Sequence, residues 1–275
     1  MTNSSIHSEL TAAQALGLAR LDAQLLLLHS LGKLDTDRAW LLAHDGDDVP
    51  HNVAQVFCGL VQRRAAGEPL AYLVGYKEFF GLRFKVDSSV LIPRPDTETL
   101  VQWALDVLAG LDGPRVLDLG TGSGAVAVCL GYLLKTVVDA SDLSQKALAV
   151  AAENARLLGA DIQFLQSNWF DKVSGYYHVI ASNPPYVAEG DPHLAALAYE
   201  PLNALTAGND GLGDIRQIVR DAPGHLHPGG WLLLEHGYDQ AGNVRKLLTE
   251  RGLVQVQSRS DLGRVERCSG GQWMG

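Results

Sequence analysis

The chain has 275 residues, of which 47% are hydrophobic and 19% are charged, and this length and composition favour two globular domains over one. Its 22 Lys and Arg residues against 31 Asp and Glu residues give a formal net charge of −9. Because binding to nucleic-acid backbones depends on basic surfaces, this charge argues against stable nucleic-acid binding and favours a basic protein as the partner.

The amino-terminal sequence MTNSSIHSEL has neither the basic start nor the apolar run of a signal peptide. The most apolar stretch, at residues 25–28, is far shorter than the roughly 20 residues that a membrane span requires. Three scattered cysteines, Cys58, Cys129 and Cys268, form no metal-binding pair, and their odd number argues against a disulfide framework. We therefore expect a cytoplasmic monomer without a metal and without membrane contact.

Leucine, valine and alanine recur at roughly helical spacing from residue 8 to residue 75, and the polar segment HDGDDVP at 44–50 is typical of a connecting loop. Apolar residues at this spacing are chiefly a packing signal. The pattern therefore predicts a small helical bundle without chemistry of its own.

Near Phe79 the pattern changes. In GLRFKV at 81–86 apolar and basic residues alternate, which predicts a strand, half of a β-hairpin. The prolines of VLIPRPDTE at 90–98 end any strand pairing. A helix is expected to follow, with Asp96 or Thr97 as its N-cap.

From Arg115 onward, strands and helices alternate along the chain. Short apolar runs that are typical of strands buried on both faces lie at 115–119, 136–141, 162–165, 178–182 and 231–235. Helical stretches separate them at 123–134, 144–157, 213–222 and 240–250. This alternation predicts a mostly parallel sheet with helices on both faces, and a domain boundary between residues 75 and 95.

The stretch VLDLGTGSG at 116–124 is a buried strand that runs into a glycine-rich turn and then a helix. Gly120, Gly122 and Gly124 let the backbone approach a ligand where a Cβ atom would collide. Alone this signal is weak, since such turns also join strands to helices without binding anything. No Lys-Ser or Lys-Thr follows the glycines, so the turn is not a phosphate-binding P-loop.

The second strand of this region, in TVVDASDLS, ends in an acid. An acid at this position can accept hydrogen bonds from both hydroxyls of a ribose. Asp142 is preferred over Asp139, because Asp142 directly precedes the next helix and Asp139 lies within the strand pattern. The glycine turn and the acid together predict a site for a nucleoside without a pyrophosphate, such as S-adenosylmethionine.

The sequence SNPPYV at 182–187 puts Asn183 at the carboxyl end of a buried strand, where open α/β sheets bind ligands. Pro184 and Pro185 fix the backbone and remove two donors, so the Asn183 side-chain oxygen and a nearby carbonyl oxygen can accept both hydrogens of an NH₂ group. Tyr186 offers a flat face to a planar amide or base. The segment predicts methyl transfer to such an NH₂ through positioning, with a rigid structural turn as the plain alternative.

At these residues the sequence resembles the class I S-adenosylmethionine-dependent methyltransferases of the HemK/PrmC type. VLDLGTGSG, Asp142, SNWF at 167–170 and NPPY match the family's motifs, and VLIPRPDTETLV at 90–101 is the more specific feature. The resemblance covers nearly the whole chain. It implies an α/β fold, a Rossmann-like domain with a mostly parallel seven-stranded sheet and helices on both faces. It implies three parts: a helical substrate-recognition domain at 1–75, a hairpin linker at 76–95 and a methyltransferase domain at 96–275.

The resemblance also implies the activity, which is methylation of the side-chain amide of the glutamine in the Gly-Gly-Gln motif of peptide-chain release factors. The methyl donor would be S-adenosylmethionine and the product S-adenosylhomocysteine. The implied donor-binding residues are Gly120, Thr121, Gly122, Ser123, Gly124, Asp142, Asn168, Trp169 and Asn183. The implied catalytic clamp around the substrate glutamine is Asn183, Pro184, Pro185 and Tyr186. Candidates to receive the release-factor loop, each also readable as a salt bridge or a turn, are Arg94, Glu98 and Glu200 with Pro201.

Two positions depart from the family pattern, with Asp96 where Glu is common and Asn168 where Asp is common. These departures imply altered donor affinity at most. The nearest alternative function is glutamine methylation of a large-subunit ribosomal protein. A nucleic-acid adenine methyltransferase is less favoured because of the acidic charge, and a nucleoside-binding regulatory protein would leave NPPY without a purpose. The chain carries a Gly-Gly-Gln of its own at 270–272, which we interpret as coincidence.

Overall fold

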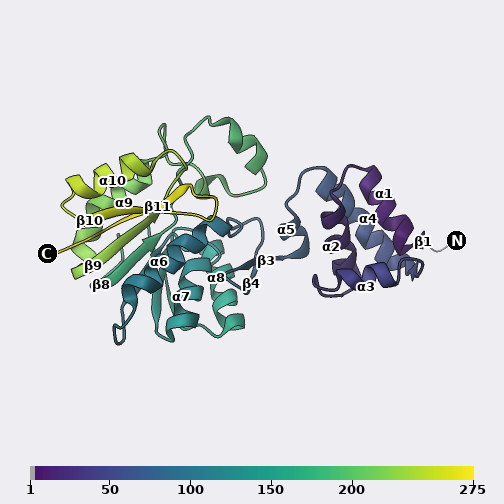
Figure 1. Cartoon of the computed structure of the whole chain (residues 1–275), viewed down its shortest axis with the longest axis horizontal. Helices are drawn as coiled ribbons and strands as arrows, with labels where there is room; N and C mark the ends of the chain where they lie inside the picture. The colour runs from purple at the N-terminus through teal and green to yellow at the C-terminus, as the bar shows by residue number, and fades with distance from the viewer. Residues whose placement is uncertain (1–3) are drawn as a thin grey trace. The chain divides into compact units, whose positions relative to one another are not determined.

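The computed structural model describes residues 4–275, and residues 1–3, the start of the predicted N-terminal domain, lie outside the described residues. The chain divides into two compact units, one ending at Tyr76 and the other running from Lys77 to Gly275 (Figure 1). No helix within residues 4–275 is long and apolar enough to cross a membrane.

The N-terminal unit is a bundle of short helices, as the apolar spacing predicts. Its elements are β1 (Ser4–Ser5), α1 (Ile6–Ala15), α2 (Arg20–Ser30), α3 (Arg38–Ala43), β2 (Asp48–Val49), α4 (His51–Ala65) and α5 (Leu70–Val74). Leu26, Leu27 and Phe57 are among the side chains that fill its core. The segment predicted as a loop contains the short strand β2, because Val49 is buried in this core and its backbone pairs with Ser4.

The segment between the bundle and the sheet begins with a hairpin. Its elements are β3 (Tyr76–Phe79), β4 (Leu82–Lys85), the 3-10 turn η1 (Pro95–Thr97) and α6 (Glu98–Leu108). The rings of Phe79 and Phe84 pack edge to face with their centroids 6.0 Å apart, which closes the predicted hairpin. Thr97 takes the N-cap position of α6, but its side chain makes no capping hydrogen bond, since its hydroxyl accepts from Asn183 instead.

The C-terminal unit is built on a seven-stranded sheet with the order β10-β11-β9-β8-β5-β6-β7. The strands are β5 (Val116–Leu119), β6 (Val138–Asp142), β7 (Ile162–Gln166), β8 (Tyr177–Ser182), β9 (Leu226–Glu235), β10 (Val254–Ser260) and β11 (Glu266–Gln272). The helices are α7 (Ala125–Leu134), α8 (Gln145–Leu158), α9 (Gly213–Asp221) and α10 (Ala241–Glu250), with 3-10 turns η2 (Pro192–Leu197), η3 (Leu202–Ala204) and η4 (Ala222–His225). Strands β5 to β9 pair in parallel. The chain runs outward from β5 to β7 and returns to β8, so the strand order reverses between β5 and β8.

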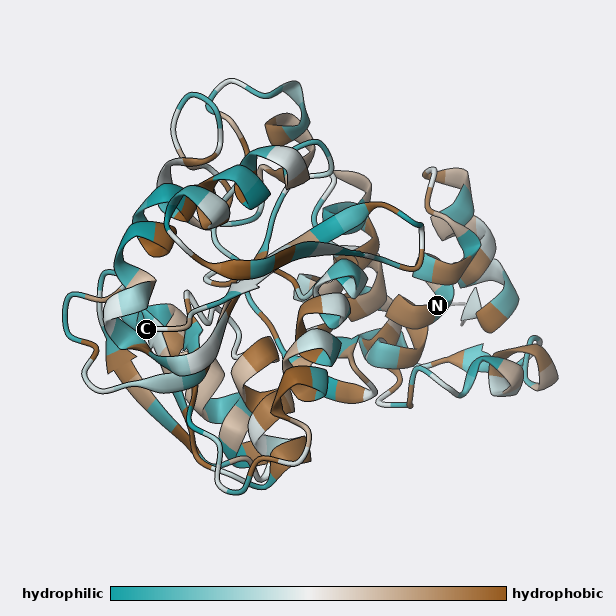
Figure 2. Ribbon diagram, turned by 60° about the vertical axis from the view of Figure 1, so that its left-hand side comes forward, coloured by the Kyte–Doolittle hydropathy of each residue, from teal (hydrophilic) through white to brown (hydrophobic). Residues whose placement is uncertain are grey.

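Helices cover both faces of this sheet, with α6, α7 and α8 on one side and α9 and α10 on the other (Figure 1). Alternate strand residues enter opposite cores: Val116 and Val179 pack with α6 and α7, whereas Leu117 and Ile180 pack with α9 and α10. Figure 2 shows apolar stretches along the inner strands and alternating apolar and polar bands on the helices. Burial on both faces explains the uninterrupted apolar runs of the sequence.

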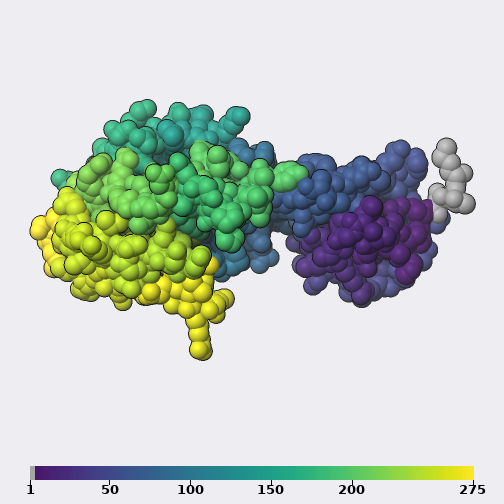
Figure 3. Space-filling view, turned by 90° about the horizontal axis from the view of Figure 1, so that it is seen from above, coloured from purple at the N-terminus to yellow at the C-terminus, as the bar shows by residue number. Residues whose placement is uncertain are grey.

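Strands β10 and β11 were not predicted from the sequence, because their residues VQVQSRS and ERCSGGQ are largely polar or small. Their turn projects from the surface in Figure 3. Leu262, which lies between the two strands in the chain, is fully exposed. Strand β11 nevertheless lies inside the sheet, antiparallel to both β9 and β10. A Cβ atom on Gly270 would sit 2.6 Å from Leu233 Cδ2 and 2.7 Å from the Leu232 carbonyl oxygen. Gly270, the first glycine of the chain's own Gly-Gly-Gln, is therefore required by the packing of β11 against β9.

Gly270→Ala is expected to lower the free energy of unfolding of the C-terminal unit by about 1–3 kcal/mol, because the added methyl group overpacks the contact with β9. Urea unfolding measures this change. The matched control is Gly242→Ala on α10, where a Cβ atom would meet no atom within 4 Å. That variant is expected to gain up to about 1 kcal/mol from helix propensity. Equal stability of the two variants would contradict the packing argument.

Candidate active site

A pocket opens at the carboxyl ends of β5, β6 and β8, beside the point where the strand order reverses. It encloses about 210 Å³ of solvent space, and its whole wall comes from the C-terminal unit, between Ser89 and Asp214. Ligands of open α/β sheets bind at this edge. The glycine turn after β5 and the NPPY segment after β8 both reach this pocket.

The glycine turn lies at the tip of β5 with positive φ values of +71° at Gly120, +55° at Gly122 and +83° at Gly124. A Cβ atom on Gly120 would lie 3.3 Å from the Trp169 ring, and one on Gly124 would lie 3.1 Å from Ala151 Cβ. The space above Gly122 is open. The turn therefore needs glycine for its backbone conformation and, at two positions, for close packing.

Gly120, Gly122 and the two hydroxyl residues between the glycines line the pocket, whereas Gly124 lies outside its wall, and its predicted contact with the donor stays a prediction. The Thr121 hydroxyl donates to Asp118 Oδ2 at 2.7 Å. The Ser123 carbonyl oxygen accepts from Asn154 Nδ2 at 2.8 Å, and the same amide group bonds to the backbone of Lys85 in β4. The turn is thus held in place by a strand on one side and by a helix on the other.

Asp142 ends β6 and lines the pocket beside the glycine turn. Its Oδ2 accepts from the Gly122 N–H at 2.9 Å and its Oδ1 accepts from the Ser144 N–H at 2.8 Å. Burial raises the pKa of this carboxyl in spite of these hydrogen bonds. Each oxygen keeps a lone pair for a ribose hydroxyl. Asp139, the alternative acid, does not line the pocket and accepts from the Tyr177 hydroxyl at 2.8 Å.

Asn168 and Trp169 belong to the segment that follows β7, and both line the pocket. The indole lies against Gly120, and its Nε1–H donates to Asp214 Oδ1 at 3.3 Å, which holds the ring in place. The exposed Asn168 amide donates to Asp171 Oδ2 at 3.3 Å. A flat ring held in this way suits a planar base such as adenine.

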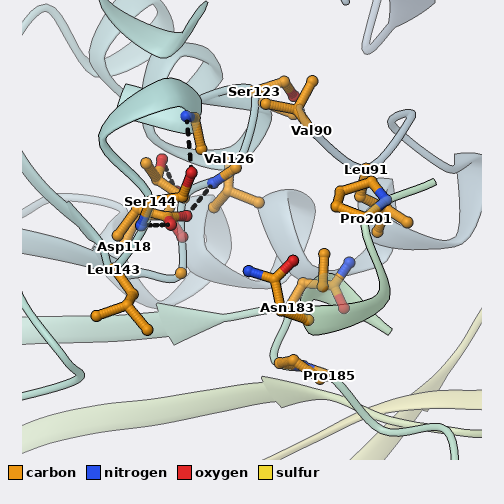
Figure 4. A pocket seen from close by; sticks show the side chains of 18 of the residues that line it. Val90, Leu91, Asp118, Ser123, Val126, Leu143, Ser144, Asn183, Pro185 and Pro201 are labelled. Carbon is orange, nitrogen blue, oxygen red and sulfur yellow. Dashed lines mark hydrogen bonds between the residues drawn. The ribbon is translucent and has the colours of Figure 1, made fainter. Parts of the chain in front are cut away.

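The Asn183 amide points into the pocket, with Pro185 beside it and Leu91 and Pro201 across from it (Figure 4). Its Nδ2 donates to Thr97 Oγ1 at 3.2 Å, which leaves the side-chain oxygen as the acceptor for a ligand. Asn183 and Pro185 belong to the predicted clamp and line the pocket.

Pro184 and Tyr186, the other clamp residues, do not line the pocket. Within residues 4–275, no donor bonds to the carbonyl oxygen of Pro184, and its predicted role as the second acceptor beside Asn183 stays a prediction. The Tyr186 hydroxyl donates to Glu235 Oε1 at 3.4 Å, and burial raises the pKa of this phenol. Its backbone N–H donates to the Leu205 carbonyl oxygen at 3.2 Å. Stacking of Tyr186 on a substrate amide stays a prediction.

The three residues expected to receive a protein loop occupy different places. Arg94 lines the pocket and forms an ion pair with Glu200. Glu200 is buried and outside the pocket wall, and its Oε2 accepts from the Ile92 N–H at 3.1 Å. Glu98 is also outside the wall, with its Oε1 accepting from the Phe80 N–H at 2.9 Å. Glu98 and Glu200 therefore hold the backbone around the pocket, and their direct contact with a substrate stays a prediction.

Glu200→Ala is expected to destabilise the C-terminal unit by about 1–3 kcal/mol, because the buried Ile92 N–H loses its acceptor. The loss of the Arg94 ion pair adds little, since Arg94 is partly exposed. Thermal unfolding measures the change. Glu189→Ala, in the exposed loop after β8, is the control and is expected to unfold like the wild type. An unchanged Glu200→Ala protein would show that Glu200 does not hold the 90–94 segment.

Both parts of the chain match known family models. The PrmC N-terminal domain matches residues 5–75, and the methyltransferase small domain matches residues 97–200. A release factor glutamine methyltransferase of Bordetella pertussis is 50% identical over 260 residues, which are 93% of this chain and 95% of the relative. A second one, of Burkholderia pseudomallei, is 46% identical over 287 residues, which are 99% of this chain and 100% of the relative.

The chain belongs to the release factor glutamine methyltransferase family. The predicted family and its methyltransferase activity are therefore confirmed.

Solved structures of other methyltransferases share the fold. The catalytic domain of hMettl16 in complex with the MAT2A 3'UTR hairpin 6 has a TM-score of 0.59 at 20% identity, covering 78% of this chain and 82% of that chain. A methyltransferase from Pyrococcus furiosus has a TM-score of 0.53 at 18% identity, covering 77% and 96%. These likenesses confirm the predicted fold class for this member of the glutamine methyltransferase family.

Several wall residues of this family member were missed in the sequence. Asp118 is fully buried, and burial raises its pKa to about 6. An acid inside an otherwise apolar strand is a costly placement, which could have marked Asp118 as a site residue. Leu91, Leu143 and Asp214 also line the pocket, but they lie in loops or at helix starts where no local pattern singles them out.

The wall suits a cationic nucleoside. Three carboxylates line it, from Asp118, Asp142 and Asp214, against the single guanidinium of Arg94. Within residues 4–275 no group of His, Cys, Asp and Glu gathers as a metal site. The residues therefore fit a ligand that joins a ribose and a flat base to a positive charge.

Proposed function

We propose that this protein transfers a methyl group from S-adenosylmethionine to the side-chain amide nitrogen of the glutamine in the Gly-Gly-Gln motif of peptide-chain release factors. The observation that carries the proposal is the Asn183 amide, which points into the pocket with its nitrogen bonded to Thr97. The names of the relatives, release factor glutamine methyltransferase, support this substrate.

Different residues of the pocket would contact different parts of S-adenosylmethionine. Asp142 would hold the ribose hydroxyls, Trp169 would flank the base, and the glycine turn at 120–124 would lie against the remainder. When bound, S-adenosylmethionine supplies a methyl group on a positively charged sulfur and leaves as S-adenosylhomocysteine. The buried carboxylate of Asp118 favours that positive charge.

The clamp acts on the acceptor nitrogen. An amide nitrogen is a poor nucleophile, because its lone pair is delocalised into the carbonyl group. Asn183 Oδ1 and the Pro184 carbonyl oxygen accept one N–H each, which orients the nitrogen and favours a pyramidal form. The new N–C bond takes the nitrogen lone pair, the broken S–C bond leaves its electrons on sulfur, and the nitrogen loses one proton to water. Positioning and electrostatics supply the rate gain.

The N-terminal unit would recognise the protein substrate, since the PrmC N-terminal domain model covers residues 5–75. The net charge of −9 suits a basic partner. A cytoplasmic location and a monomeric state belong to the same proposal.

The test uses purified protein with S-adenosylmethionine labelled in its methyl group. Three acceptors are compared: a full-length release factor, large ribosomal subunits and DNA. We expect label on the release factor alone, mapped by mass spectrometry to the glutamine of Gly-Gly-Gln, and none on a release factor in which that glutamine is alanine. Label confined to a ribosomal protein or to DNA would overturn the proposed substrate.

A further inference from the structure

A buried amide on α8 contacts the glycine turn from outside the pocket. Asn154 is fully buried and is not part of the pocket wall, and it lies one helical turn beyond Ala151, which is close to Gly124. Its Oδ1 accepts from the Lys85 N–H at 2.7 Å. Its Nδ2 donates to the carbonyl oxygens of Lys85 at 3.0 Å and of Ser123 at 2.8 Å. The amide therefore joins strand β4 of the hairpin to the turn that lines the pocket.

The backbone of Lys85 fixes the direction in which this amide faces. A backbone N–H can only donate, so the atom of Asn154 that meets it must be the oxygen. Both hydrogens of Nδ2 then point to carbonyl oxygens, one on the hairpin and one on the turn. A reversed amide would place nitrogen against the Lys85 N–H and oxygen against two carbonyl oxygens, which leaves all these buried groups without partners.

The bond from Asn154 holds one peptide group of the turn. This group joins Ser123 to Gly124, and its N–H donates to the Thr121 carbonyl oxygen at 2.8 Å. Gly124 has a φ of +83°, and glycine adopts positive and negative φ with similar ease, so the residue itself does not fix the peptide plane. Asn154 and Thr121 hold the plane by its carbonyl oxygen and its N–H.

We propose that Asn154 is a positioning residue that couples the hairpin β3–β4 to the donor-binding turn, so that the affinity for S-adenosylmethionine depends on a contact outside the pocket. This inference rests on the proposed role of the turn at 120–124 in binding the methyl donor. Four of the five residues of the turn line the pocket. A peptide group that rotates freely beside them lowers the fraction of molecules that are ready to bind the donor. Because coupling is reciprocal, a bound donor also stabilises the contact between Asn154 and Lys85.

The first measurement is hydrogen exchange of backbone amides in the wild-type protein, with and without S-adenosylmethionine. We expect the donor to slow exchange of the Lys85 amide about fivefold more than exchange of the Phe80 amide. Phe80 is the matched reference, because it lies in the same hairpin and its N–H is held by Glu98 of α6 at 2.9 Å instead of by Asn154. Equal slowing of the two amides would mean that the donor only stabilises the unit as a whole, and would overturn the coupling.

The second measurement uses variants, with calorimetric titration of the donor and exchange of the Gly124 amide. Asn154→Ala is expected to weaken donor binding about 10-fold and to speed this exchange in the donor-free protein. Asn154→Asp keeps the shape and the acceptor for Lys85, but it turns an oxygen toward the Ser123 carbonyl oxygen, so we expect the same two effects. If Asn154→Ala did not fold, Asn154→Asp and the wild-type exchange would decide.

Two controls separate positioning from lost stability. Gly270→Ala is expected to destabilise the same unit at a distant strand and should keep the donor affinity and the Gly124 exchange of the wild type. Glu153→Gln, a partly exposed carboxyl that precedes Asn154 and pairs with Arg156, should also match the wild type. If Gly270→Ala weakened the donor as much as the Asn154 variants did, the effect would be one of stability and the coupling would be overturned.

The outcomes also separate the inference from the proposed function. Wild-type donor affinity and wild-type Gly124 exchange in the Asn154 variants would overturn the coupling, while methylation of release factors stands. If the protein bound the donor but methylated no release factor, the proposed function would fail, and these measurements would still decide the coupling because none of them needs an acceptor. A wild-type protein that bound no S-adenosylmethionine would overturn both.

Discussion

An Asn183→Ala protein is expected to bind S-adenosylmethionine nearly as well as the wild type and to lose about 100- to 1000-fold in kcat with a release factor. The methyl group of alanine removes the acceptor that faces the pocket and the donor that bonds to Thr97 at 3.2 Å. Asp142 and Trp169, which we propose hold the ribose and the base, stay intact, because they come from β6 and the segment after β7. Calorimetric titration of the donor and single-turnover methylation measure the two effects.

Asn243→Ala, at an exposed position of α10, is the control for Asn183→Ala and should have wild-type kcat. Asn183→Asp adds a finer comparison, because it keeps an acceptor but has no N–H for Thr97. We expect it to stay as slow as the alanine variant. Undiminished turnover of Asn183→Ala would show that the substrate nitrogen is held elsewhere, and the clamp would have to be abandoned.

An Asp142→Ala protein is expected to bind S-adenosylmethionine about 100-fold more weakly, because two hydrogen bonds from ribose to a charged group are lost. The change also leaves the N–H groups of Gly122 and Ser144 without their acceptor, which loosens the glycine turn. The dissociation constant for the donor measures the effect. At saturating donor kcat should recover, since the clamp is untouched.

Asp139→Ala is the matched control for Asp142→Ala. Asp139 lies in the same strand, but its carboxylate bonds to the Tyr177 hydroxyl and to Arg115, away from the pocket. We expect this variant to lose stability and to keep its donor affinity. If Asp139→Ala weakened the donor and Asp142→Ala did not, the assignment of the ribose acid would be reversed.

The parts of the site that the sequence could predict are those that a short local pattern in the chain marks, each at the end of a strand. Gly120 to Gly124 directly follow β5, Asp142 is the last residue of β6, and Asn183 directly follows β8. In a doubly wound sheet, the carboxyl ends of neighbouring parallel strands meet at one edge. Three local patterns and this rule were enough to bring the glycine turn, the acid and the amide to one pocket.

The parts that the sequence could not predict depend on contacts between distant segments. Threonine is a common N-cap residue, so the sequence suggests a local role for Thr97. Its side chain instead accepts a hydrogen bond from Asn183, which lies 86 residues away in the chain. Glu200 appeared as a residue for substrate contact, yet its carboxylate holds the Ile92 backbone 108 residues away. Tertiary packing decides which distant residues form such hydrogen bonds, and these contacts produce no periodic pattern in the sequence. The interior place of β11 was missed for the same reason, since its polar residues and glycines are typical of an edge or a loop.

The last strand of the chain fills an interior gap of the sheet, between β9 and β10. Because β11 follows β10 in the chain but lies between β10 and β9, β10 reaches the sheet only through β11. The two strands therefore have to join β9 as one hairpin. A cut in the turn that connects them would leave β9 as an open edge, with its backbone groups free to pair with another chain.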